Sequence, residues 1–552
     1  MRFAFLSLAF GVGCAVPSVG LADEFHFKAP DGSGDFETVG NWWVNDLPAT
    51  ALPGEGDQIC CTNGPQTIRF AEAGASRLVG RVSLDRYLYD SQNKIQRCRD
   101  QQLSLDLNGG TLCVTGVVAM RASRYEGVVC PSFTVTNGTL FADGIKCAGA
   151  DSNYRGRFAA LGAGTRVVCS NETFLVEGAE SKAVIGGGAS LVWHGKGYPS
   201  VSSAQDYPTA ELVVEGAGTT LSGTNGFYLG GFCRWIVRDQ ARVSFAGYCT
   251  PGLYGRQDRS SIGSGNGARL RSDAELLIDD ATFSVTNGKS IMVANADRYS
   301  LSGHRLTIQN NGSLNFSGET SLHLAYVQSA PGVATSNVIS VCSGGRLAAD
   351  GNTVPSEWST VGAITVGGGE GDCCENGVYV SNGVVSVNHL TLGGSKSSSN
   401  NWLRVEGRTS RVLLNQKFAA PGNLPNNRGN PALGLYNDAR LELTLGPDGF
   451  DNPPIEMTTE LGRIYGQQME GSDQKARLVV RDCGFAQKHP DETVVLIKTL
   501  NAANRGYFET LIADATILAA RNHYCGTLSV SADGMSLCYT APSRRGGVIR
   551  VR

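Results

Sequence analysis

Acid–base catalysis of hydrolysis or elimination requires carboxylates, or a carboxylate and a base, that face each other across a short gap. Three pairs of charged residues lie close together in the chain: Asp279 with Asp280, Glu370 with Asp372, and Arg298 with Arg305. Neighbouring residues on a strand point to opposite faces, so Asp279 and Asp280 cannot act as one pair on a strand. We expect both at a solvated turn. Glu370 and Asp372 flank Gly371 in an expected loop, where they could bind a cation.

Sequence motifs of the common catalytic and cofactor sites are absent. The chain has no GxSxG elbow and no Ser, His and Asp order typical of a triad. Glycine runs at Gly186 and Gly367 precede neither a helix nor the lysine of a phosphate-binding loop. The seven histidines are scattered, and no CxxC or HxxxH spacing that would suit zinc occurs. We therefore predict no catalytic residue, no cofactor and no metal ion.

Two adjacent tryptophans, Trp42 and Trp43, could stack on sugar rings. On a strand, one of the two would point outward. The alternative is structural: Trp42 caps the open end of a hydrophobic interior, and Trp43 covers its rim. We favour the capping role.

The chain contains 16 cysteines, of which 15 follow residue 22. The vicinal pairs Cys60-Cys61 and Cys373-Cys374 cannot readily form a disulfide of ordinary geometry within themselves. Three further cysteines recur at 17-residue steps: Cys113, Cys130 and Cys147. We predict that some cysteines bridge neighbouring repeats, with free buried thiols as the alternative. An odd number also suggests that one exposed cysteine of a vicinal pair links two chains.

These residues lie in a chain with a clear internal repeat between about residues 105 and 445. A short phrase recurs in which a strand meets a turn rich in Asn, Asp or Gly, and an alternating strand follows. Examples are LDLNGGTLCV, VTNGTLFA, LTIQNNGSLNF and VYVSNGVVSV. Twelve copies begin between Leu112 and Leu441, at a mean step of about 30 residues.

Two or three short strands per repeat, separated by Gly or Asn, are typical of a coiled β-solenoid. We predict an all-β, right-handed parallel β-helix with eleven or twelve coils over residues 105–445, about 55 Å long at ~4.8 Å per coil. The predicted inward-facing residues are Leu112, Leu140, Leu221, Leu314 and Leu347. We expect Asn137, Asn311 and Asn382 to adopt left-handed turn conformations and to stack as a structural ladder.

Composition agrees with a turn-rich, folded chain. Glycine numbers 71 of 552 residues, charged residues are 18%, and the hydrophobic fraction of 41% suffices for a core. Charge-driven disorder is therefore excluded. The formal net charge of −3 lacks the basic excess of a nucleic-acid-binding surface, so we predict no nucleic-acid partner.

The N-terminus resembles a secretory signal peptide. Arg2 is followed by an apolar run from Phe3 to Val12 and by small residues up to Ala22. We expect cleavage after Ala22, an extracellular or cell-surface location in a bacterium, and no transmembrane segment in the mature chain. An oxidising compartment would also permit disulfides.

The repeat region resembles the β-helical passenger regions of bacterial surface and autotransporter-associated proteins, with their recurring VxNGxLxV phrases. Their typical opening is matched by Gly34-Asp35-Phe36, Asn41-Trp42, Pro53 and Gly56-Asp57. The resemblance implies the fold but not the function, because adhesins, enzymes and inert scaffolds all share this solenoid. The sequence ends in SRRGGVIRVR and shows no run of about ten-residue amphipathic strands typical of a translocator barrel, so we do not expect self-transport of the autotransporter kind.

A second resemblance is to pectin methylesterases, which share a phrase like DGSGDFETV at Asp31 to Val39. Their Gln-Asp-Thr and Asp-Phe-Ile-Phe-Gly segments, which supply acid and nucleophile, are absent, so no catalytic residue is carried over.

The sequence thus divides into a signal peptide (1–22), an N-terminal cap with the first strands (23–104), the solenoid repeats (105–450) and a β-rich C-terminal cap (451–552). We expect the C-terminal cap to include a helical segment over Thr510–Arg521 and a hairpin that turns at Ala532-Asp533-Gly534. The first functional hypothesis is a secreted, non-enzymatic structural or adhesive protein. The alternatives are a polysaccharide-active lyase or esterase of the pectin-lyase-like fold, and a carbohydrate-binding scaffold. The expected partners are cell-surface glycans or other copies of the chain.

Overall fold

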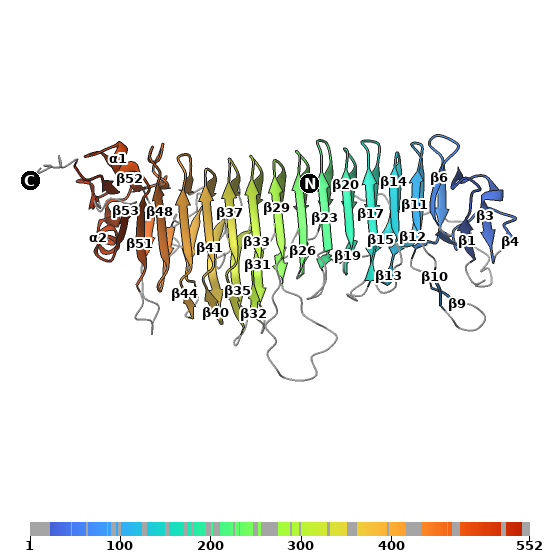
Figure 1. The fold of residues 1–552 in the computed structure, drawn as a ribbon, viewed down its shortest axis with the longest axis horizontal. Coiled ribbons are helices and arrows are strands. Elements are labelled where there is room, and N and C mark those ends of the chain that lie inside the picture. Colours follow the sequence, from blue (N-terminus) through green and yellow to red (C-terminus); the bar gives the residue numbers. More distant parts are fainter. Residues whose placement is uncertain are drawn as a thin grey trace, which may run out of the picture.

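A computed structural model shows an all-β protein in which short strands repeat along one long axis, from an N-terminal cap to a C-terminal cap (Figure 1). The fold class predicted from the repeat, a parallel β-helix, is confirmed. The structure describes residues 23–543 except 46, 62–63, 85–86, 90–94, 98–100, 124–129, 149–153, 171–173, 179, 195–199, 203–209, 225–226, 231, 247–251, 255–273, 287–289, 297–299, 319, 328–331, 350–361, 395–396, 416–431, 461, 466–474 and 520–525.

One wall of the helix is a sixteen-stranded sheet whose neighbouring strands all pair in parallel; we call it sheet B. Its strands, in order, are β2 (Ser33–Asp35), β6 (Pro65–Arg69), β11 (Gln102–Asp106), β14 (Ser132–Thr136), β17 (Arg157–Leu161), β20 (Lys182–Gly186), β23 (Ala210–Glu215), β26 (Cys233–Arg238), β29 (Glu275–Asp279), β33 (Arg305–Gln309), β37 (Val338–Cys342), β41 (Gly377–Ser381), β45 (Trp402–Glu406), β48 (Arg440–Leu445), β51 (Arg477–Asp482) and β53 (Thr516–Ala519). The stretch from β11 to β48 holds twelve of these strands, which matches the predicted number of coils.

Two further ladders follow sheet B in each coil. The first comprises β7 (Ser76–Val79), β12 (Thr111–Met120), β15 (Thr139–Cys147), β18 (Arg166–Cys169), β21 (Ser190–Trp193), β24 (Thr220–Gly223), β27 (Arg242–Ala246), β30 (Thr282–Thr286), β34 (Ser313–Ser317), β38 (Arg346–Ala349), β42 (Val384–Val387), β46 (Arg411–Leu414), β49 (Ile455–Met457) and β52 (Thr493–Lys498). The second comprises β1 (Glu24–Phe27), β5 (Gln58–Cys61), β8 (Arg81–Leu84), the second halves of β12 and β15, β19 (Phe174–Glu177), β22 (Ser200–Ser202), β25 (Tyr228–Leu229), β28 (Gly252–Tyr254), β31 (Ser290–Ala296), β35 (Ser321–Val327), β39 (Ala363–Gly369), β43 (His389–Leu392), β47 (Ala432–Leu435) and β50 (Arg463–Tyr465).

Smaller sheets lie beside these ladders. A four-stranded parallel sheet adds a side to the later coils, through β32 (Ser300–Ser302), β36 (Val333–Thr335), β40 (Asp372–Cys374) and β44 (Ser398–Ser399). Two antiparallel pairs are formed by β9 (Tyr87–Tyr89) with β10 (Ile95–Arg97) and by β13 (Ala122–Ser123) with β16 (Tyr154–Arg155).

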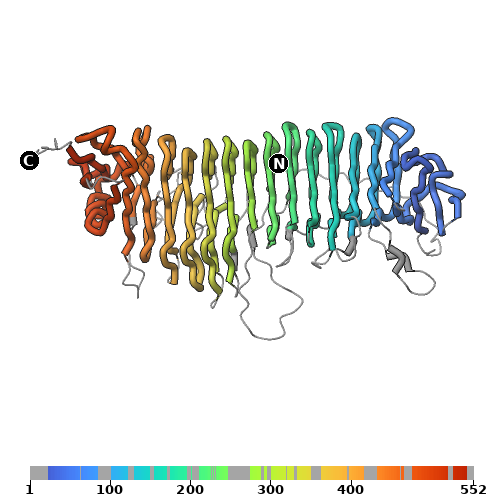
Figure 2. The backbone as a smooth tube through the Cα atoms, viewed as in Figure 1, coloured from blue at the N-terminus to red at the C-terminus, as the bar shows by residue number. Residues whose placement is uncertain are grey.

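Alternation of apolar and polar residues decides which side chains enter the interior. In β14, Phe133 and Val135 are buried, whereas the other three residues of the strand, which alternate with them, are half-buried. The five leucines predicted to point inward are all at most 1% exposed. They belong to one row of residues in register: Leu112, Leu140, Val167, Leu191, Leu221, Val243, Phe283, Leu314, Leu347, Val385 and Val412. Stacked rows of this kind form a continuous core along the rod, whose coils succeed one another without a break in Figure 2.

The turns confirm part of the asparagine prediction. Asn137, Asn311 and Asn382 have φ of 56°, 65° and 52°, in the left-handed region that asparagine tolerates. They do not stack, because they follow β14, β33 and β41, which are not adjacent in sheet B.

A buried asparagine ladder exists elsewhere, on the residues that directly precede the sheet B strands. The backbone N–H of His304 donates to Oδ1 of Asn337 (3.0 Å), and that of Asn337 donates to Oδ1 of Asn376 (3.1 Å). The backbone N–H of Asn376 in turn donates to Oδ1 of Asn401 (3.1 Å). These four residues are 0% exposed, so the ladder satisfies backbone donors that water does not reach.

Antiparallel strands cover both ends of the ladders. At the N-terminal end, β3 (Trp42–Val44) pairs with β1 and with β4 (Leu47–Pro48). At the C-terminal end, β55 (Ser536–Thr540) pairs antiparallel with β52 and with β54 (Thr527–Val530), which confirms the hairpin with its turn at 531–535. The helical prediction is only partly right: α2 spans Arg505–Ala513, whereas β53 occupies 516–519 and adds a last strand to sheet B. A short helix, α1 (Phe485–Lys488), precedes it.

Among the described residues, no helix is long and apolar enough to cross a membrane.

Candidate functional site

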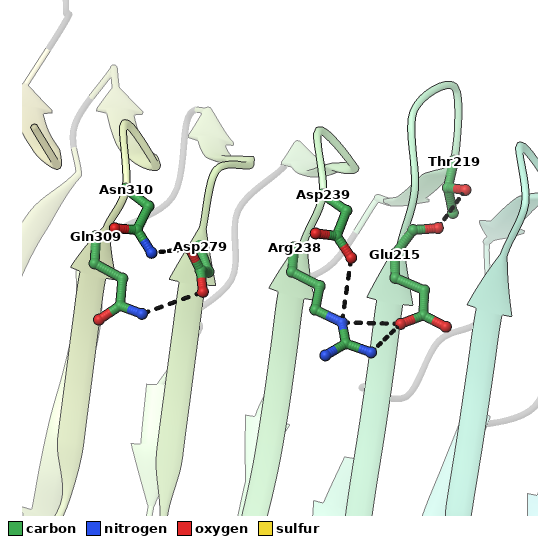
Figure 3. Close-up of polar contacts among 7 residues, drawn as sticks. All are labelled: Glu215, Thr219, Arg238, Asp239, Asp279, Gln309 and Asn310. Carbon is green, nitrogen blue, oxygen red and sulfur yellow. Dashed lines mark hydrogen bonds and ion pairs between the residues drawn. The ribbon is translucent and has the colours of Figure 1, made fainter. Parts of the chain in front are cut away.

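The expectation that both Asp279 and Asp280 lie at a turn is only partly right, because Asp279 is the last residue of strand β29. Asp279 accepts hydrogen bonds from Gln309 Nε2 (3.1 Å) and Asn310 Nδ2 (2.7 Å) of the next coil (Figure 3). Asp280 has φ of 48° and lies in the turn, as expected. The Asp279 carboxylate therefore stabilises the contact between two coils.

The other charged candidates that the structure describes occupy a loop and the ends of strands. Glu370 lies between β39 and β40, and Asp372 is exposed at the start of β40. Arg305 begins β33, whereas Arg298 lies outside the described residues. Nowhere in the described chain do three or more His, Cys, Asp or Glu residues gather as a metal site would require.

The three cysteines that recur at 17-residue steps are free thiols in the structure; they are Cys113, Cys130 and Cys147. Cys130 and Cys147 are buried, and burial raises the pKa of the Cys130 thiol to about 11 and that of Cys147 well above its usual range. A thiol with so high a pKa contributes little thiolate at neutral pH, so these side chains behave as small apolar groups.

The vicinal cysteines occupy strands of the solenoid walls. Cys60 and Cys61 are both buried on β5. On β40, Cys373 is buried, and its Sγ lies 3.2 Å from the carbonyl oxygen of Ala325. Cys374 is half-buried on the same strand, and Ser399 Oγ donates a hydrogen bond to its sulfur (3.1 Å). Cys374 is thus the most accessible member of the two pairs.

Of the two tryptophans considered for glycan stacking, Trp42 is excluded. Its side chain is 0% exposed, its Nε1–H donates to the carbonyl of Phe36 (2.8 Å), and it packs edge-on against Phe27 and Phe36. It fills the interior at the N-terminal end, so no face is free for a sugar. Trp43 is half-buried, and the ammonium of Lys28 lies 4.7 Å from its ring centroid.

The outer face of sheet B carries most of the organised charge. In its middle section charges pair between adjacent strands: Lys182 with Glu211 (2.6 Å), Arg234 with Glu275 (2.8 Å), and Arg238 Nε with Glu215 (2.9 Å). Arg238 Nε also lies 3.4 Å from Asp239. Figure 3 shows these contacts of Arg238 beside Asp279. The hydrogen bond with Glu215 raises the pKa of the Arg238 guanidinium.

Toward the C-terminal end of the same face the pairing changes. Glu442 on β48 lies among three guanidinium groups, those of Arg404 (2.8 Å), Arg440 (3.8 Å) and Arg481 (3.9 Å). Its side chain is only 3% exposed, because the three arginines, each 36–44% exposed, cover it. We call Arg404, Arg440, Glu442 and Arg481 the basic cluster.

Aromatic residues border the basic cluster. The indole of Trp402 lies over Gly377 on the preceding strand, where a side-chain Cβ would come within 2.1 Å of the ring. The guanidinium of Arg404 is 5.3 Å from the centroid of that ring. Tyr379 on β41 donates its hydroxyl proton to Glu406 on β45, and desolvation together with this bond raises the pKa of Tyr379. The patch combines a flat apolar ring with positive charge.

The basic cluster was not among the residues expected from the sequence. Trp402, Arg404 and Glu406 alternate along one strand, and Arg440 and Glu442 along the next, with the period of an exposed face. The alternation can be recognised in the sequence. The register that places the two strands side by side cannot, because 38 residues separate Arg404 from Glu442.

The chain is a parallel β-helix with a basic and aromatic patch on one wall. No family model matches it, and neither the curated proteins nor the solved structures provide a match.

Proposed function

We propose that this protein is secreted and serves, without enzymatic activity, as a structural or adhesive protein of the bacterial cell surface or extracellular matrix. The observation that carries the proposal is the ladder itself: sixteen parallel strands of sheet B follow one another along a rod with a cap at each end (Figure 1). A rod of stacked coils displays a long, regular outer surface, which suits attachment and spacing.

The arrangement of charges supports a non-enzymatic role. A hydrolase or lyase needs convergent groups that the protein itself leaves available to the substrate. In the middle of sheet B, however, Lys182, Arg234 and Arg238 are each engaged by a carboxylate of a neighbouring strand. Asp279 is likewise engaged by Gln309 and Asn310. These charges stabilise the contacts between coils.

Localisation tests the proposal directly. The full chain, expressed in a bacterium, is expected at the cell surface or in the medium, where antibody labelling of intact cells and protease shaving would detect it. A matched chain that lacks residues 1–22 should stay inside the cell. Retention of the full chain in the cytoplasm would contradict the proposal.

An activity screen separates this function from a polysaccharide lyase or esterase. The purified protein is expected to release neither unsaturated products nor methanol from a panel of neutral, acidic and methyl-esterified polysaccharides. Turnover that Tyr379→Phe or Glu406→Gln abolishes, in a variant that remains folded, would establish the enzymatic alternative instead.

A further inference from the structure

We propose that the basic cluster and Trp402 bind an acidic polysaccharide, with sugar-borne carboxylate or sulfate groups held by arginines and a sugar ring placed against the indole. The inference rests on the proposed extracellular function, and it supplies the class of ligand that this function lacks.

The charge balance of the cluster is the first argument. Glu442 has one negative charge, and three guanidiniums lie within 4 Å of it, at 2.8, 3.8 and 3.9 Å. Two positive charges therefore remain without a carboxylate inside the cluster. The middle section of the sheet differs, because Arg234 and Arg238 are each engaged by a carboxylate of a neighbouring strand, Glu275 and Glu215. An anion from outside would balance the surplus.

Glu442 also orients its neighbours for such an anion. Both Nε and Nη2 of Arg404 lie within 2.9 Å of the same carboxylate oxygen, Oε2. This contact fixes the plane of the Arg404 guanidinium at the surface. A guanidinium held in place binds a carboxylate or sulfate with a smaller loss of conformational freedom than a mobile one.

Two weakly engaged guanidiniums lie near Glu442. Arg440 is 36% exposed and its contact with Glu442 is long (3.8 Å), although its Nε–H is buried and has no hydrogen-bond partner among the described residues. Arg477, on the next strand in register with Arg440, is exposed, and the described residues include no ion-pair partner for it. Arg440 and Arg477 therefore lie opposite each other on adjacent strands, whose backbones are ~4.8 Å apart.

The aromatic neighbour points to a sugar chain, because a small free anion would gain nothing from it. Trp402 is in register with Arg440, so Trp402, Arg440 and Arg477 form one row across β45, β48 and β51. The indole is half-buried over Gly377, which leaves part of its surface accessible to the apolar C–H face of a sugar ring. The row thus presents an apolar platform and then two positive charges along the direction of the rod.

A binding assay on the full secreted chain tests this site. The probes are immobilised heparin for sulfate groups, hyaluronate for carboxylate groups, dextran as a neutral polysaccharide, and single-stranded DNA as a polyphosphate. We expect binding to heparin or hyaluronate, or to both, to weaken as salt concentration rises, and no binding to dextran. The relative affinities identify which acidic group the site prefers.

Two variants locate the interaction. Arg440→Gln combined with Arg477→Gln should weaken acidic-polysaccharide binding at least about tenfold, because charge-assisted hydrogen bonds are lost. Trp402→Ala should weaken binding while leaving its salt dependence nearly unchanged. The control, Arg234→Gln combined with Arg238→Gln, removes the same charge from the same face of sheet B and should bind like the wild type. Circular dichroism would verify that each variant is folded.

The proposal is overturned if no acidic polysaccharide binds better than dextran, if single-stranded DNA binds more tightly than both acidic polysaccharides, or if the control variant loses binding as severely as Arg440→Gln/Arg477→Gln. None of these results bears on where the protein resides. Conversely, a cytoplasmic location would overturn the proposed function and leave the binding measurement to stand on its own.

Discussion

At the scale of single residues, the interior rows bind one coil to the next through apolar contact. Leu221 is 1% exposed and lies in register between Leu191 of one neighbouring coil and Val243 of the other. The same row continues through most of the rod, so each inward side chain is packed from both sides along the axis. Interiors packed in this way respond to the loss of even a few methylene groups.

Leu221→Ala is expected to lower the free energy of unfolding by ~2–5 kcal/mol, because it removes buried apolar surface and leaves a cavity between two coils. Urea denaturation followed by circular dichroism would measure the change. Leu161→Ala is the control, since Leu161 is 37% exposed on the outer face of sheet B and should change stability by less than ~0.5 kcal/mol. Equal losses in the two variants would contradict the inward packing.

The buried asparagine ladder binds coils through hydrogen bonds. Asn376 accepts from the backbone N–H and from the Nδ2 of Asn337, while its own Nδ2 donates to the carbonyl of Ala334 (2.9 Å). Asn376→Ala would leave the two Asn337 donors buried without a partner. We expect the free energy of unfolding to fall by about 1–3 kcal/mol for each donor that loses its acceptor. Thermal unfolding measures it. Asn315→Ala, at a half-buried outward position, should be nearly neutral.

One residue of this ladder predicts a pH dependence. Burial lowers the pKa of His304 from 6.5 to about 3. The unfolded chain therefore binds a proton at this histidine at higher pH than the folded chain does. The neutral, buried His304 therefore contributes fully to the free energy of unfolding above pH 6.5. This contribution is lost progressively as pH falls from 6.5 toward about 3.

His304→Gln should therefore flatten the decline in stability between pH 6.5 and about 4, measured as the difference in urea midpoint from the wild type. The exposed His194, changed to Gln, serves as the control and should leave the profile unchanged. A parallel decline in the His304→Gln variant and in the wild type would contradict the assignment.

At the scale of elements, a buried carboxylate ties the C-terminal cap to the last coils. Asp482, at the end of β51, accepts from the backbone N–H groups of Gly484 and Ala486 at the start of α1. It also accepts the hydroxyl proton of Tyr539 on β55 (2.6 Å). One side chain thus joins sheet B, a helix and the terminal hairpin.

Tyr539→Phe is expected to lower the stability of the cap by about 1.5–3 kcal/mol, since a buried, charge-assisted hydrogen bond is lost with no change of shape. Hydrogen exchange would show the loss as faster exchange in β54 and β55, with the central coils unaffected. Uniformly faster exchange along the rod would instead indicate that the cap and the coils unfold as one unit.

The elements also show how far the sequence alone could lead. The repeat phrase identified the strands and the inward leucines, because alternation and turn residues are local signals. It did not reveal the asparagine ladder or the basic cluster. Partners in register are separated by 23 residues for Glu215 and Arg238 but by 41 for Arg234 and Glu275, since loop lengths vary between coils. Contacts across coils therefore depend on the three-dimensional register.

At the scale of the whole molecule, the ends of the rod decide whether it remains a single chain. A solenoid would otherwise expose unpaired strand edges at both ends, and such edges recruit other chains. At the C-terminal end, β52 is covered by antiparallel β55, and β55 is covered in turn by β54. Because β55 runs antiparallel to β52, a strand of another chain cannot continue the parallel ladder there.

Removal of residues 526–552 is therefore expected to cause aggregation or end-to-end stacking of chains, because it uncovers the backbone groups of β52 that β55 engages. Size-exclusion chromatography with light scattering would detect the larger species, and electron microscopy would distinguish stacked rods from amorphous aggregates. Removal of residues 544–552 alone keeps the hairpin and is the matched control, which should elute as the full chain does. A monodisperse 526–552 deletion with the mass of one chain would show that the hairpin is dispensable, and that the edge of β52 does not by itself recruit another copy.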